Sequence, residues 1–98
     1  MQVFYKLKKV GTHTILAICD AEILDKTLND GKLVFHVKKE FYKGKKVPLD
    51  QALELIASAS IVNMVGTNVV KKAIQKKYVH PDATLTIGDV LHAQIVKL

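Results

Sequence analysis

Three polar side chains in the second half of the chain are of types that suit ligand recognition. Asn63 interrupts an apolar run, and His92 and Gln94 alternate with apolar neighbours near the end of the sequence. On a β-strand, residues two apart point to the same face and lie roughly 7 Å apart. The imidazole of His92 and the amide of Gln94 would therefore share a face. If Asn63 lies nearby, these groups and the neighbouring Gly66 would form a neutral recognition pocket.

Asn63 also has a purely structural interpretation. A buried amide without partners costs on the order of 1–3 kcal/mol, so we expect it to be hydrogen-bonded. The amide would then satisfy backbone groups at a helix end beside Gly66. The sequence leaves both interpretations open.

The residues do not combine into a set typical of an enzyme or a metal site. Cys19 and His92 would be a candidate nucleophile pair, but Cys19 ends an apolar segment in which a buried, inert thiol is the usual outcome. None of the four histidines has metal-ligand spacing with another histidine or with Cys19. The dispersed glycines form neither a phosphate-binding loop nor a dinucleotide fingerprint. These observations favour a protein that is not an enzyme, with no catalytic residue, metal or cofactor.

The positive charge of the chain comes only from lysine. The sequence has 15 basic residues, none of them arginine, and a net charge of +6 at pH 7. Arginine is the usual residue for bidentate phosphate binding and for reading guanine, so its absence argues against sequence-specific DNA recognition. Lysine attracts phosphate as a point charge, although a solvated surface or a thermophilic composition also produces many lysines.

The lysines cluster in two places, and aromatic residues interrupt the first cluster. Aromatic rings beside basic residues suit single-stranded RNA, whose bases stack on them. In the alternative interpretation, Phe41 belongs to the core and Tyr42 belongs to it in part. The candidate nucleic-acid-binding residues are Lys38, Lys39, Tyr42, Lys43, Lys45, Lys46, Lys71, Lys72 and Lys76.

Helices and strands must position these residues. Apolar residues recur at helical spacing over residues 49–60 and 67–78, and we expect two helices joined at Gly66, which can adopt a positive φ. Residues 61–65 break the helical pattern, so the first helix either is buried all round at its end or kinks there. We expect a short helix at residues 21–28. Strands are expected at residues 2–8, 13–19, 32–41, 84–87 and 92–98.

These elements predict a single α+β domain over residues 1–98, with a mainly antiparallel sheet of about five strands, a helix pair and one short helix. The apolar fraction of 49% argues against disorder. No apolar run approaches the roughly 20 residues needed to cross a bilayer. A single cysteine fits a reducing compartment. We therefore expect a soluble, cytoplasmic protein without a membrane partner.

Three short motifs stand out in the sequence. They are Cys19-Asp20 before the short helix, Asn63-x-Val65-Gly66 between the helix pair and His92-Ala93-Gln94 in the last strand. With these motifs the chain resembles, over essentially its whole length, an uncharacterised archaeal protein family classed only as a domain of unknown function. The resemblance implies a cytoplasmic archaeal protein and no established activity.

The sequence thus predicts a small, non-enzymatic, basic binding module whose lysines attract phosphate, with RNA or a ribonucleoprotein as partner. The alternative is a protein-interaction or small-ligand-binding module centred on Asn63, His92 and Gln94. Salt dependence separates the two, because each lysine that neutralises a phosphate releases counterion.

Overall fold

A six-stranded mixed sheet forms the frame of the protein, which the computed structural model describes over the whole chain, Met1–Leu98. Strands β2 and β6 run parallel, and every other neighbouring pair is antiparallel. The expected α+β class is confirmed, with six strands in the main sheet where about five were expected. In sheet order the strands are β5 (Lys45–Pro48), β1 (Gln2–Val10), β2 (His13–Asp20), β6 (Ile61–Val65), β8 (Val90–Val96) and β7 (Thr84–Ile87).

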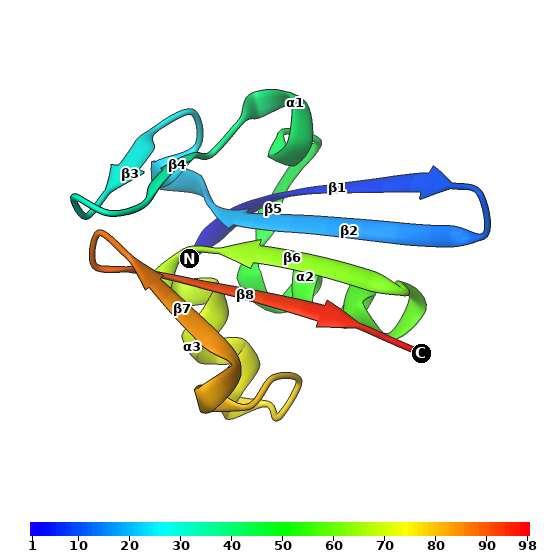
Figure 1. Ribbon diagram of the computed structural model, residues 1–98. Helices are drawn as coiled ribbons and strands as arrows, with labels where there is room; N and C mark the ends of the chain where they lie inside the picture. The colour runs from blue at the N-terminus through cyan, green and yellow to red at the C-terminus, as the bar shows by residue number, and fades with distance from the viewer.

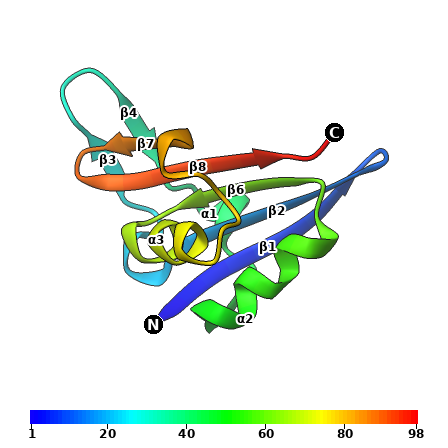
Figure 2. The ribbon, with the colours of Figure 1, turned by 90° about the horizontal axis from the view of Figure 1, so that it is seen from below.

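The two faces of the sheet are covered differently. Helix α2 (Leu49–Glu54), its 3₁₀ extension η2 (Leu55–Ser58) and helix α3 (Thr67–Gln75) lie on one face, below the sheet in Figure 1 and in front of it in Figure 2. On the other face lie strands β3 (Thr27–Asn29) and β4 (Val34–His36) and helix α1 (Lys39–Tyr42). We call residues 27–42 the cap. The short 3₁₀ turn η1 (Ala21–Ile23) precedes β3, and the turn η3 (Pro81–Ala83) precedes β7. None of the helices is long and apolar enough to span a membrane.

Side chains of the central strands β2 and β6 point alternately to the two faces of the sheet and contribute to two apolar cores. Leu16 and Ile18 of β2 pack with Val62 and Met64 of β6 against α2 and α3. The intervening side chains point the other way. They form a smaller core with the cap, whose members include Ala17, Cys19, Val65, Val37 and Tyr42.

The main difference from the sequence prediction lies at residues 61–65. They form the central strand β6, so α2 and α3 are not a helix pair joined at Gly66. The break in helical spacing was the signal of a strand, because Val62 and Met64 are buried while Asn63 between them points to the opposite face. Ser60 fixes the start of this strand: its N–H donates to the Thr14 carbonyl at 2.9 Å, and its Oγ accepts from the Thr14 N–H at 2.9 Å.

Two further expected elements are replaced by shorter ones. Residues 21–28 were expected to be a helix, but only Ala21–Ile23 are helical, and Asp25 has a φ of 68° that ends the helical path. The Asp25 N–H instead donates to the Val37 carbonyl at 2.7 Å. Of residues 32–41, expected to be a strand, only Val34–His36 are extended in β4, and the chain turns into α1 at Lys39.

Asp20, at the end of β2, caps helix α3. Its carboxylate accepts hydrogen bonds from the backbone N–H groups of Asn68 at 2.9 Å and Val69 at 3.0 Å. The residue is only 3% exposed, and this desolvation raises the pKa of the carboxyl, while the two amide bonds act in the opposite direction. A helix N-terminus attracts anions, and here the chain's own carboxylate occupies that position.

Gly66 makes the approach of Asp20 feasible. Its φ is 131°, which confirms the positive φ expected from the sequence. A Cβ at this position would lie 2.4 Å from Cγ of Asp20. The absence of a side chain at residue 66 is therefore required by both the backbone and the buried carboxylate.

We predict that Gly66→Ala lowers the free energy of unfolding by at least about 2 kcal/mol, because it combines backbone strain with displacement of Asp20. For a domain of this size the melting temperature should fall by about 8 °C or more. Gly11→Ala is the matched control, since Gly11 also has a positive φ of 61° but has no atom within 4 Å of an added Cβ. Thermal unfolding of both variants checks the prediction, and equal losses would contradict it.

Candidate functional site

The sheet face opposite α2 and α3 is only partly covered. The strand register places Lys6, Ala17, Asn63 and Gln94 in one row across four strands. The cap packs over the row next to it, which contains Cys19 and Val65, and also over Ala17, which is only 2% exposed. The rest of the first row and the row beyond it form a surface that we call the free face. It consists of Lys6, Asn63 and Gln94 in the first row and Lys8, Ile15, Ile61 and Val96 in the second.

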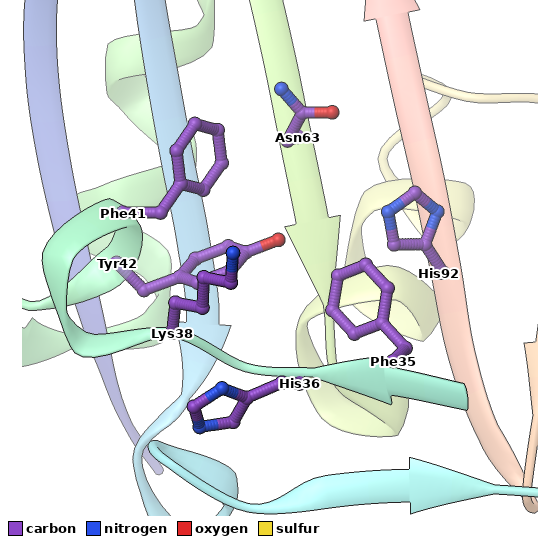
Figure 3. A pocket seen from close by; sticks show the side chains of 7 residues that line it. All are labelled: Phe35, His36, Lys38, Phe41, Tyr42, Asn63 and His92. Atoms are coloured by element: carbon purple, nitrogen blue, oxygen red, sulfur yellow. The ribbon is translucent and has the colours of Figure 1, made fainter.

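A pocket of about 300 Å³ opens between the free face and the cap, and we call it the sheet pocket. Asn63 of β6 and His92 of β8 come from the sheet, and the other side chains come from the cap. In Figure 3 most of these side chains surround a common space, while the His36 ring lies on the other side of the β4 ribbon. The lining residues are Phe35, His36, Lys38, Phe41, Tyr42, Asn63 and His92.

Two polar groups in the sheet pocket are free to bind a ligand. Tyr42 is 2% exposed, yet its hydroxyl takes part in none of the chain's hydrogen bonds. Because no fully buried side-chain oxygen lacks a partner, this hydroxyl must reach the pocket. Burial raises the pKa of Tyr42, so the hydroxyl keeps its proton and can donate. The Asn63 amide, also without a partner, can donate and accept.

Aromatic rings form the walls. The rings of Phe35 and His92 meet edge to face with their centroids 5.3 Å apart, and those of Phe41 and Tyr42 do so at 4.9 Å. Burial lowers the pKa of His92, so its imidazole is neutral near pH 7. The pocket therefore combines aromatic rings with a neutral amide, a phenol and the ammonium group of Lys38, which suits a planar, polar-edged ligand.

A charged group fixes β4 at the edge of the pocket. The Asp25 carboxylate lies 2.9 Å from Nε2 of His36 and 3.7 Å from Nζ of Lys39. The hydrogen bond from His36 is the main cause that holds the pKa of Asp25 below its usual value. All three side chains are about half exposed, so we assign the group a positioning role for the cap and little stability.

Comparison with known proteins identifies the family. The family described as "Protein of unknown function (DUF424)" matches residues 8–98. The chain belongs to the DUF424 family. A crystal structure of an uncharacterized conserved protein from Methanopyrus kandleri shares the fold, with a TM-score of 0.82 and 23% identity over 97% of this chain and 90% of that chain. Curated proteins gave no match. The expected membership of a family of unknown function is confirmed.

In this DUF424 protein, residues from both predicted sets meet in the sheet pocket. Asn63 and His92 come from the proposed polar cluster, and Lys38 and Tyr42 come from the first lysine cluster. Gln94 lies opposite Asn63 on β8 but does not line the pocket. Gly66 shapes the junction with Asp20 and is not part of the pocket.

The two lysine clusters do not form one surface. In the first, Nζ of Lys46 lies 5.9 Å from the centre of the Phe4 ring, and Lys39 pairs with Asp25. Lys45 lies beside Tyr5, on the edge strand, and Lys43 follows α1. The second cluster, Lys71, Lys72 and Lys76, belongs to α3 and the residue after it, on the opposite side of the sheet.

Sequence reasoning did not select five residues that surround the free face. Phe35, His36 and Phe41 line the sheet pocket because α1 and β4 fold back over the sheet. Lys6 and Lys8 lie on the free face itself. The signal for the two lysines was present, since they share one side of the alternating strand at residues 2–8 with Phe4.

The surroundings of Cys19 do not activate its thiol. Cys19 is buried, and desolvation raises the pKa of its thiol to about 12, so the thiolate is not available as a nucleophile. No three histidine, cysteine or acidic side chains gather in a group that could hold a metal ion.

His92 gives a measurable property of the pocket. Its pKa is lower in the folded chain than the usual value of about 6.5, so the unfolded chain binds the proton more readily. Stability should therefore be lost as the pH falls from about 7 through 6.5 towards the lowered pKa. We predict that His92→Phe, which keeps a ring against Phe35, loses less stability than the wild type between pH 7.5 and 5. Urea unfolding of both proteins across this pH range checks the prediction. It would be contradicted if the free energy of unfolding changed with pH in the same way in both.

Proposed function

We propose that this protein binds single-stranded RNA across the free face and that the sheet pocket receives one base. The observation that carries the proposal is the hydroxyl of the otherwise buried Tyr42, which reaches an aromatic pocket and has no partner in the chain. Proteins that bind single-stranded RNA take up unstacked bases by stacking on aromatic rings and by hydrogen bonds to the base edges. Phe35, Phe41 and His92 offer rings, while Tyr42 and Asn63 offer the polar groups.

The positive charge around the sheet pocket favours binding of an RNA phosphate backbone. Lys38 lines the sheet pocket, and Lys46 lies on the edge strand β5, with its Nζ 5.9 Å from the centre of the Phe4 ring. Neither makes an ion pair with an acidic side chain of the chain. Lysines of this kind attract phosphates as point charges and do not read sequence. We therefore infer affinity for the strand with modest preference among bases.

A second candidate function is supported by the size of the pocket. About 300 Å³ is at the lower end of the range for small-molecule sites. A free nucleoside or another small planar compound would use the same Tyr42 and Asn63 groups without any need for the lysines. Gln94, outside the lining, would then contribute nothing directly. Dependence of affinity on oligonucleotide length separates the two candidates.

We predict that Tyr42→Phe weakens binding of a fluorescent single-stranded RNA of ten nucleotides by about 2- to 12-fold, because one hydrogen bond is worth roughly 0.5–1.5 kcal/mol. The melting temperature should stay close to that of the wild type, since the hydroxyl has no partner within the chain. Fluorescence anisotropy and thermal unfolding measure the two quantities.

Replacing Lys71, Lys72 and Lys76 together by glutamine provides the control, because these side chains lie on the other side of the sheet. RNA affinity should change little in this variant. If the wild type binds RNA no better than a neutral protein at 0.15 M salt, RNA is not the partner. If mononucleotides bind as tightly as the ten-nucleotide strand, the small-ligand function takes its place.

A further inference from the structure

A second, smaller hollow lies on the free face beside the sheet pocket. It has a volume of about 110 Å³, and we call it the slot. Ile15 and Ala17 of β2 come from the sheet, and Phe41 and Glu40 come from α1. The lining residues are Lys6, Lys8, Val10, Ile15, Ala17, Glu40 and Phe41.

The slot and the sheet pocket are neighbours separated by one ring. Phe41 lines both hollows and is 37% exposed, so one ring borders two binding spaces. Strand register gives their spacing. Asn63 of the pocket is opposite Ala17, and Ala17 is opposite Lys6 of the slot. Asn63 and Lys6 are thus two strand spacings apart, or about 10 Å.

The slot has the chemistry of a nucleotide site, because its lining combines apolar side chains, an aromatic ring and two cations. Ile15 and Ala17 are apolar, and Phe41 presents a ring for stacking. Nζ of Lys6 donates to the Glu40 carbonyl at 2.7 Å, which holds this ammonium in place while leaving it further donors. Lys8 is exposed and makes no ion pair, so its ammonium is free to meet a phosphate.

One group opposes an anionic ligand. Glu40 lines the slot, and its carboxylate takes part in none of the ion pairs of the structure. Its charge would repel a phosphate at Lys8 and so reduce affinity. The charge balance of the slot is nevertheless positive, with two lysines against one glutamate.

We propose that the slot binds the nucleotide adjacent to the one whose base occupies the sheet pocket, so that the strand crosses the sheet from β8 towards β1 with Phe41 between two bases. This inference rests on the proposed RNA-binding function. It assigns Lys6 and Lys8 to the phosphate backbone and Phe41 to stacking on both sides. It also gives the minimum ligand as a dinucleotide.

The test compares two lysines of the same strand. Lys8 lines the slot, whereas Lys9 points to the opposite side of β1. Loss of one phosphate contact to a single strand reduces the slope of log affinity against log salt by about 0.7, which amounts to about fivefold in affinity at 0.1 M salt. We predict this loss for Lys8→Gln, little change for Lys9→Gln, and tighter binding for Glu40→Gln. Anisotropy titrations with the ten-nucleotide RNA over a salt series measure all three.

The outcomes separate this inference from the function on which it rests. If Tyr42→Phe weakens binding but Lys8→Gln and Lys9→Gln behave alike, RNA binding stands and the slot is not a subsite. If the wild type does not bind RNA, the proposed function itself fails. A second measurement with mono-, di- and trinucleotides should show the largest gain in affinity from one nucleotide to two in the wild type. The same gain in Lys8→Gln would overturn the inference.

Discussion

The parallel pairing of β2 with β6 is the constraint on which the rest of the structure depends. At one end of this pairing, the Asp20 carboxylate accepts two backbone hydrogen bonds from the start of α3. Only glycine at residue 66 leaves room for the carboxylate in this position. At the other end, Ser60 is hydrogen-bonded to Thr14. With both ends fixed, the register brings Asn63 to the middle of the sheet. A shift of one residue would bury this amide against α2 and α3.

The same register gives the two faces of the sheet different side chains. Val62 and Met64 supply the apolar surface that α2 and α3 cover, whereas Asn63 stands on the face that the cap covers only in part. The cap is a short hairpin and one helical turn, so it buries Cys19, Val65 and the neighbouring Ala17 but leaves the rest of the next row uncovered. The sheet pocket and the slot, with Lys6 and Lys8, therefore lie along the edge of the cap. A partly covered sheet face with aromatic and cationic groups is the physical basis for the proposed binding of a single strand.

The sequence predicted the class, the long helical faces and the terminal hairpins because these follow from local periodicity. It did not predict β6 as a strand, since five apolar-rich residues after a helix fit either a buried helix end or a strand, and the pairing with β2 decides between them. The cap was also missed, because its short elements are fixed by contacts such as Asp25 with His36 and Val37 and not by pattern. For the site, Asn63 and His92 were selected by residue type, but their meeting with Lys38 and Tyr42 depends on the fold of the cap.

In the proposed binding mode, RNA contacts the free face and not the lysine-rich side of α3. A ¹⁵N NMR titration with a short single-stranded RNA distinguishes the two surfaces through side-chain amide signals, because the chain carries such groups on both sides. Asn63 lies in the sheet pocket, while Asn68 and Gln75 lie on α3. We predict that the Asn63 amide shifts on binding and that the Asn68 and Gln75 amides do not. Shifts at Asn68 and Gln75 with an unchanged Asn63 signal would contradict binding at the free face.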